Sequence, residues 1–256
     1  MTNMTREKLR LFYHPASSAS MRVTLYLRCR GVPQDAVELV ATGIGTDERG
    51  IVVFTMPEGD PVTEALGTTD LTAFNPEGRV PILLLPDGRK LTQTGPIIEY
   101  LEATLDLPGG QQLLPEDHWA VAEAKRIMWI VAADIQPYQN LPFIIQAMSD
   151  WGMVKAEPTK HPLREHYIRR EFGAIELLLQ KSAGKFAVGD QITLADCFLV
   201  PQIRNALLTD IDLAGEFPTL WSVWEAMIGT SEVLQVLEEA GGIVQPIAFD
   251  PTTFET

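Results

Sequence analysis

The pattern of apolar residues changes once along the chain, near residue 105, and this change limits the folds that the sequence can adopt. Before it, short apolar runs alternate with turn residues; from about Leu114 onward the spacing of apolar residues is helical. A chain of 256 residues is long enough for one or two domains. We therefore predict an α/β domain over residues 1–107 and an all-helical domain over residues 113–256.

The first domain is predicted to run β-α-β and then β-β-α. The expected strands are residues 8–14, 36–40, 80–85 and 90–92, and the expected helices are residues 21–30 and 96–105. A Pro-Asp-Gly-Arg turn joins the last two strands. Connection rules favour a right-handed crossover in the first half and an antiparallel hairpin in the second.

The second domain is predicted to contain only helices. They span residues 116–148, 163–181, 194–208, 218–227 and 231–240. Pro137 is expected to kink or divide the first of them, because proline has no N–H for the helical ladder. The very apolar helix over 194–208 is expected at the centre of the domain.

Residues 41–70 fit neither pattern, because they are rich in glycine and carry six acidic residues against one arginine. A strand over residues 51–55 is expected inside this acidic insertion. Two interpretations stay open: a solvated surface excursion, or a lid or wall beside a site, since long loops in compact domains are often functional.

Composition excludes several classes of function. Twenty Lys and Arg against 34 Asp and Glu give a net charge of −14, which argues against a nucleic-acid or anionic membrane partner. No apolar run reaches the roughly 18 residues of a membrane span. The polar N-terminus gives no sign of a signal peptide. Two cysteines, Cys29 and Cys197, suit a reducing compartment, so we expect a cytoplasmic protein. His161 and His166 lack the spacing of a helical metal pair, and no metal is expected.

Three segments place backbone polar groups at the ends of elements in the first domain. Ser17 and Ser18 open a helix, whose free N–H groups and partial positive charge stabilise anions. Val80-Pro81 begins a strand and is a candidate cis peptide. Gln93-Thr94 enters another helix. Each segment alone is also explained by capping or by an edge-strand proline. Together they indicate a site for a small, extended, anionic, peptide-like ligand.

Five collinear motifs resemble the glutathione S-transferases, and most closely their zeta class, which includes maleylacetoacetate isomerase. The motifs are Ser17-Ser18 with Arg22-Val23; Asn75-Pro76 with Val80-Pro81; Gln93-Thr94 with Ile97-Ile98-Glu99-Tyr100-Leu101-Glu102; Ile135-Gln136-Pro137-Tyr138-Gln139-Asn140-Leu141; and Val188-Gly189-Asp190 with Thr193, Asp196 and Val200-Pro201-Gln202. The resemblance covers nearly the whole chain apart from 41–70 and the tail.

The resemblance implies a thioredoxin-like N-terminal domain, an all-α C-terminal domain and a homodimer that binds glutathione in each subunit. Ser17 would donate a hydrogen bond to the glutathione sulfur, with Ser18 beside it as a second candidate catalytic residue. One donor at a helix N-terminus favours thiolate over thiol. Further glutathione-binding residues are implied at Val80 and Pro81 (the cysteinyl backbone), Gln93 and Thr94 (the γ-glutamyl end), and Gln136 and Asn140.

The chain also departs from the zeta pattern. Ala19 and Met21 replace the class cysteine and tryptophan, and Leu208 falls near the place of an arginine thought to hold a substrate carboxylate. Arg204, one helical turn earlier, is a candidate replacement. His14 and Arg22 are further candidates for tuning or contacting the substrate, and Tyr13 is an alternative thiol partner. Thr193 and Asp196 form a capping-box pattern with a structural role.

Three functions follow from the resemblance and its departures. The first is a glutathione transferase that activates the thiol for attack on a small electrophile. The second is a glutathione-dependent cis–trans isomerase of the maleylacetoacetate or maleylpyruvate type, with reductive dehalogenation or ether cleavage as a smaller alternative. The third is a non-catalytic interaction module with the same fold.

Overall fold

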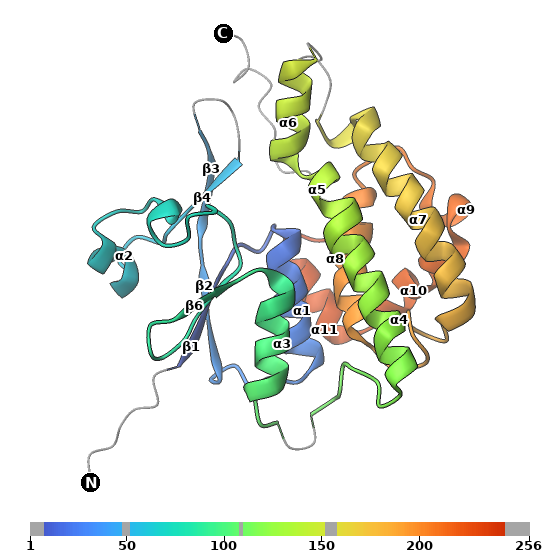
Figure 1. The fold of residues 1–256 in the computed structure, drawn as a ribbon, viewed down its shortest axis with the longest axis horizontal. Helices are drawn as coiled ribbons and strands as arrows, with labels where there is room; N and C mark the ends of the chain where they lie inside the picture. The colour runs from blue at the N-terminus through green and yellow to red at the C-terminus, as the bar shows by residue number, and fades with distance from the viewer. Residues whose placement is uncertain (1–7, 48–51, 108–109, 152–157, 244–256) are drawn as a thin grey trace.

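The computed structural model describes residues 8–47, 52–107, 110–151 and 158–243. In Figure 1 a sheet with two covering helices stands on one side, and a larger group of helices stands on the other. The two parts follow each other along the chain, as predicted from the change near residue 105. The α/β domain and the all-helical domain of the prediction are both present.

The main sheet has the strand order β2-β1-β5-β6. Its strands are β1 (Leu9–Tyr13), β2 (Val37–Ala41), β5 (Ile82–Leu84) and β6 (Lys90–Thr92). β1 pairs parallel with β2, and β5 pairs antiparallel with both β1 and β6. This is the predicted β-α-β and β-β-α order.

Two helices, α1 (Ser18–Cys29) and α3 (Thr94–Thr104), lie between the sheet and the helical domain. α1 begins three residues before the predicted start, because the side chain of Ser17 caps it. Its apolar side chains then pack on α8 (Leu194–Ala206) of the second domain.

The acidic insertion forms a β-hairpin and a short helix. Strands β3 (Gly43–Thr46) and β4 (Val52–Thr55) pair antiparallel, and α2 spans Pro61–Leu66, followed by a 3₁₀ turn at Leu71–Ala73. The predicted strand over 51–55 is present from Val52, while residue 51 lies outside the described residues. Met56 is buried in a small core with Phe12 and Val80, so the insertion is anchored to the sheet rather than wholly solvated.

The second domain is helical in every described element. Its helices are α4 (His118–Trp129), α5 (Gln136–Gln139), α6 (Leu141–Asp150), α7 (Pro162–Ser182), α8 (Leu194–Ala206), α9 (Leu213–Glu216), α10 (Pro218–Ile228) and α11 (Ser231–Glu239). A 3₁₀ turn lies at Pro158–Lys160 before α7. The short α2 and α9 and strand β3 were not predicted.

The predicted helix over 116–148 is divided, although not at Pro137 itself. A π-helical turn, Ile130–Ile135, precedes the proline, and the chain turns to extended backbone at Asn140. Proline cannot donate to the helical ladder and collides with the carbonyl four residues earlier. The wider π turn removes the need for that hydrogen bond, so the helix continues through Pro137. It then stops before Pro142, the next proline.

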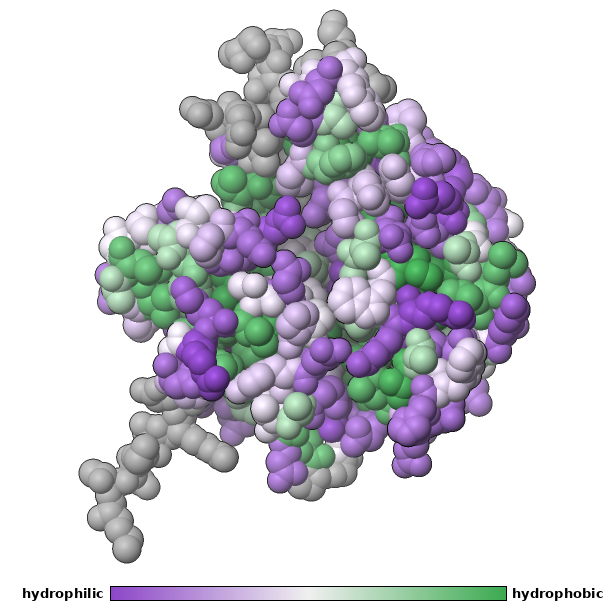
Figure 2. Space-filling model, in the orientation of Figure 1, coloured by the Kyte–Doolittle hydropathy of each residue, from purple (hydrophilic) through white to green (hydrophobic). Residues whose placement is uncertain are grey.

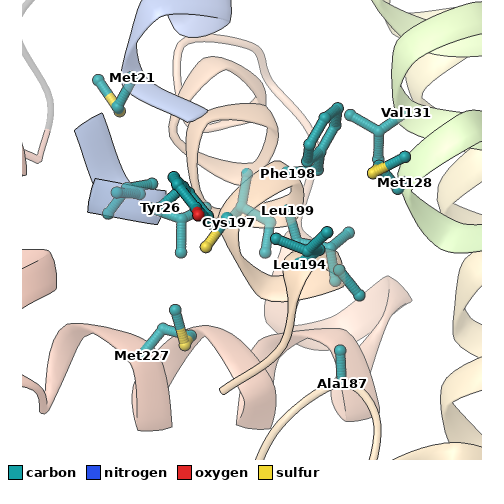
Figure 3. Packing of buried hydrophobic residues seen from close by; sticks show 14 of the residues in the cluster. Met21, Tyr26, Met128, Val131, Ala187, Leu194, Cys197, Phe198, Leu199 and Met227 are labelled. Carbon is teal, nitrogen blue, oxygen red and sulfur yellow. The ribbon is translucent and has the colours of Figure 1, made fainter. Parts of the chain in front are cut away.

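Helix α8 is the centre of the main core, as expected. Figure 3 shows Cys197, Phe198 and Leu199 of α8 between Tyr26 of α1 and Met128 of α4. α8 begins with a capping box, in which the Asp196 carboxylate accepts hydrogen bonds from the Thr193 N–H and hydroxyl. Burial raises the pKa of Asp196 to about 6. The predicted structural role of this motif is confirmed.

No helix in the described part of the chain is long and apolar enough to cross a membrane. Figure 2 shows hydrophilic residues over much of the visible face, with separate hydrophobic patches between them.

Candidate active site

The first segment of the site is the start of α1. The Ser17 N–H donates to the His14 carbonyl at 3.0 Å, and Ser17 Oγ accepts from the Ser20 N–H at 3.4 Å. A serine hydroxyl has one hydrogen and two lone pairs, so accepting this bond leaves the Ser17 O–H able to donate. Capping and anion binding, the two interpretations of Ser17, are therefore compatible. The first turn carries no acidic residue that would oppose an anion.

Gln136 of the helical domain reaches Ser18 of the first domain. Its Nε2 donates to Ser18 Oγ at 3.1 Å, across 118 residues of sequence. Gln136 Oε1 is buried and has no hydrogen-bond partner among the described residues. Asn140 follows one helical turn later, at the junction of α5 and α6, and its N–H donates to the Gln136 carbonyl at 3.1 Å. The two domains therefore meet at the start of α1.

The Gln93-Thr94 segment joins the same place from α3. Thr94 Oγ1 donates to the Ala19 carbonyl at 3.1 Å. Gln93 has φ +70°, an uncommon conformation for a residue other than glycine and one that often marks a functional site. Its exposed side chain donates to Glu77 at 2.8 Å and makes no capping bond to α3. For Gln93, the capping interpretation is wrong.

The Val80-Pro81 peptide bond is cis, as the sequence indicated. Both side chains are buried, and Val80 belongs to the small core that also contains Phe12 and Met56. The turn before this bond is fixed by Asn75, whose Nδ2 donates to the Arg79 carbonyl at 2.8 Å.

His14 lies at the junction between β1 and α1. Its Nδ1 accepts from the Ala16 N–H at 3.2 Å, which assigns the ring proton to Nε2 in the neutral form. Burial lowers the pKa of His14, so the ring is neutral at pH 7. The ring contacts Phe54 of β4, with centroids 5.6 Å apart. The sequence did not single out Phe54. Two predictions pointed toward it: a strand over residues 51–55, and the acidic insertion as a wall beside a site.

The guanidinium groups of Arg22 and Arg204 do not point to an open site where a substrate carboxylate could contact them. Arg22 is 3% exposed, lies over the Phe198 ring at 4.8 Å, and leaves Nε and Nη2 without partners among the described residues. Burial lowers its pKa to about 9. Arg204 donates to the carbonyls of Ala240 and Gly242, both at 2.9 Å, after the end of α11. Leu208 is half-buried in the turn after α8. The structure thus argues against Arg204 as a replacement for the missing arginine.

A separate hollow of about 680 Å³ lies between the start of α4, the end of α7 and residues 188–193. None of the site residues described above lines it. Within the described ranges, no group of three or more His, Cys, Asp or Glu side chains is placed to hold a metal ion.

Comparisons with known proteins agree with this arrangement. The model of the glutathione S-transferase N-terminal domain matches residues 16–104, and that of the C-terminal domain matches residues 142–239. Maleylacetoacetate isomerase of Mus musculus is 32% identical over 88% of this chain and 90% of its own length. Probable maleylacetoacetate isomerase 2 of Drosophila melanogaster is 32% identical over 79% of this chain and 76% of its own.

Two solved structures extend the similarity to the whole fold. Maleylacetoacetate isomerase from Anaeromyxobacter dehalogenans 2CP-1, with GSH bound in its active site, has a TM-score of 0.67 and 28% identity, covering 95% of this chain and 98% of its own. A bacterial maleyl pyruvate isomerase of the zeta class has a TM-score of 0.69 and 26% identity, covering 93% of this chain and 99% of its own. The chain belongs to the glutathione S-transferase family and is most like its zeta class.

Proposed function

We propose that the protein is a zeta-like glutathione transferase, which activates the glutathione thiol for attack on a small electrophile. The observation that carries this proposal is the Ser17 hydroxyl at the N-terminus of α1, which caps the helix and keeps its hydrogen available. That hydrogen and the free N–H groups of the first turn favour a thiolate over a thiol.

The remaining segments would hold the peptide part of glutathione. Thr94 and Gln93, at the start of α3, bind its γ-glutamyl end, and Val80, held by the cis bond to Pro81, pairs with its cysteinyl backbone. Gln136 supplies a polar group from the second domain beside Ser18. These assignments rest on the family motifs and on the meeting of three element ends at one place.

A cis–trans isomerase is the second candidate, because the curated relatives reported above are maleylacetoacetate isomerases. In this reaction the thiolate forms a C–S bond to the cis double bond, and the π electrons move to the conjugated carbonyl as an enolate. Rotation about the resulting single bond follows. The enolate electrons then restore the double bond in the trans form, the C–S bond breaks, and the thiolate is released.

We also propose a cytoplasmic homodimer. Three large apolar side chains stand exposed on the neighbouring helices α4 and α7: Trp119 at 71%, Trp129 at 54% and Leu177 at 61%. Aromatic side chains such as tryptophan are enriched at protein–protein interfaces. Sedimentation equilibrium should give twice the chain mass, and Trp129→Glu should shift the protein toward the monomer; a wild-type monomer at all concentrations would refute the dimer.

The test of the proposed function is a pH titration of thiolate absorbance for glutathione bound to the wild type and to Ser17→Ala. The bound thiol should have a pKa well below that of free glutathione. Ser17→Ala should raise it by about one to two pH units, because a hydrogen bond to a charged group contributes about 1.5–3 kcal/mol and one unit is 1.36 kcal/mol. Ser222→Ala, on the exposed side of α10, is the matched control and should change nothing.

Two other outcomes would redirect the assignment. Saturable binding with a lowered thiol pKa that Ser17→Ala leaves unchanged would refute Ser17 as the activating group and favour Tyr13, whose own pKa is raised by burial. No binding would refute the catalytic proposal and leave an interaction module with this fold.

A further inference from the structure

The acidic insertion is fixed beside the candidate active site by its first residues. The N–H and the hydroxyl of Thr42 both donate to the Tyr13 carbonyl, at 2.8 and 3.2 Å. Gly43 then pairs with Thr55 so closely that a Cβ at Gly43 would collide with the Thr55 side chain. The base of the β3–β4 hairpin is therefore held at the end of β1, one residue before His14.

At this position Phe54 contacts His14 of the candidate site. Its ring meets the His14 ring at 5.6 Å between centroids, with the planes tilted by 47°. Phe54 also packs against the small core that contains Phe12 and Met56, so its ring is supported from behind while remaining partly exposed. The His14 carbonyl accepts the Ser17 N–H, so the backbone links this ring pair to the residue proposed to hold the sulfur.

The helical domain meets the site at the start of α5. The hydrogen bond between Gln136 and Ser18 fixes the start of α5 at the site. Tyr138 and Phe143 follow within the next two turns, with rings in an edge-to-face contact at 5.8 Å. The Tyr138 ring also stacks on Tyr167 of α7 at 4.2 Å, so this aromatic group packs on α7. Phe143 is 39% exposed. In Figure 1 the β3–β4 hairpin and α6 rise at the same end of the molecule.

Among the described residues, the arginines considered for a substrate carboxylate do not direct their charges to this place. A bound dicarboxylate needs a cationic partner, most often a bidentate arginine. Arg22 is buried between α1 and α8 against the Phe198 ring. Arg204 is hydrogen-bonded to main-chain carbonyls after α11, and residue 208 is leucine. A flat ring, by comparison, gains offset or edge-to-face contacts with Phe54 and His14.

We propose that Phe54 and His14 form an aromatic wall of the electrophile site, and that the protein prefers electrophiles bearing an aromatic ring to dicarboxylates. This inference rests on the proposed function, because it assumes that the glutathione sulfur lies at Ser17. Phe54 is a specificity-determining residue in this scheme and takes no part in forming the thiolate.

The test is calorimetric titration with three glutathione derivatives: S-benzyl, S-methyl and S-carboxymethyl glutathione. Wild type should bind the benzyl derivative at least about tenfold more tightly than the other two, a difference of about 1.4 kcal/mol. Phe54→Ala should weaken the benzyl derivative about tenfold and leave the methyl derivative and glutathione unchanged. Phe54→Tyr should restore the preference. Val53→Ala, on the opposite face of β4, is the matched control.

Three results would overturn the inference. Equal weakening of all ligands by Phe54→Ala would mean that Phe54 covers glutathione. A wild type without preference for the benzyl group, or with preference for the carboxymethyl group, would refute the substrate class. Should Phe54→Ala fail to fold, Phe54→Leu keeps most of the side-chain volume without the ring and should still lose the benzyl preference. Failure of the proposed function is recognised separately, because glutathione itself would then bind without a lowered thiol pKa.

Discussion

Replacing one member of the buried amide pair between α5 and α8 should destabilise the protein far more than replacing both. Gln139 Nε2 donates to Gln202 Oε1 and Gln202 Nε2 donates to Gln139 Oε1, each at 2.9 Å. Gln139 is 3% exposed and Gln202 is fully buried. The pair fixes α5, the helix that begins with the residue bonded to Ser18.

The magnitude follows from the groups left without partners. Gln202→Leu keeps a similar volume but leaves the amide N–H and C=O of Gln139 buried and unpaired, at about 1–3 kcal/mol for each group. We expect a loss of about 2–6 kcal/mol in the free energy of unfolding, and a similar loss for Gln139→Leu. The double leucine variant leaves no amide unpaired and should lie within about 1 kcal/mol of wild type.

Urea unfolding of the four proteins at one fixed protein concentration measures this cycle. The two single losses should fail to add by at least about 2 kcal/mol. The reasoning is refuted if the double variant loses the sum of the two single losses, because the cost would then come from packing rather than from stranded amides. Glutathione affinity provides a second readout: it should fall in the single variants and recover in the double variant.

Three further predictions follow from buried charges and thiols. Cys29 and Cys197 are both buried and should resist a thiol reagent in the native state but react on unfolding; the contact with Cys29 and burial also raise the pKa of Cys197. Labelling followed by mass spectrometry measures this, and fast labelling of the native protein would contradict the prediction. Arg22→Met should raise the pKa of the bound glutathione thiol, because it removes a positive charge from α1, the helix proposed to hold the sulfur. It should leave urea stability at or above that of wild type, because the guanidinium is buried with no acidic partner among the described residues; a large loss of stability would show that the cation is structural. Burial raises the pKa of Asp60, but the interaction with Arg10 and the hydrogen bonds from the Val62 and Thr63 N–H groups together outweigh burial and leave the pKa below its ordinary value. This carboxylate therefore stabilises the fold above about pH 4, and its contribution disappears as pH falls through the lowered pKa. Asp60→Asn should lose stability at pH 7 and show a flatter acid limb, and an unchanged acid limb would exclude Asp60.

The regular elements could be predicted because their signals are local. Gly31 ends α1, and a Pro-Asp-Gly turn fixes the β5–β6 hairpin, so residues a few positions apart determine both. The short helix α2 was missed although Asp60 caps it and Pro61 opens it, because six residues give too little periodicity to stand out in an acidic, glycine-rich segment.

The site was predicted less completely, because its geometry depends on partners distant in sequence. The motif around Ser17 and the cis bond before Pro81 follow from local pattern. The direction in which the Arg204 side chain points does not follow from local pattern, because it depends on carbonyls 36 and 38 residues later. The contact of Phe54 with His14 likewise depends on how Thr42 docks the hairpin on β1, which no spacing rule gives.

The hydrogen bond between Gln136 and Ser18 has a consequence for how such proteins can be recombined. One partner belongs to the N-terminal domain and the other to the helical domain, so neither domain alone holds all residues of the candidate active site. Consider a chimera that joins this N-terminal domain to the helical domain of a relative. It can retain the hydrogen bond only where the relative has a donor side chain as long as glutamine, placed after a comparable π turn. Exchange between family members is therefore restricted at this one contact, even where the rest of the interface is compatible.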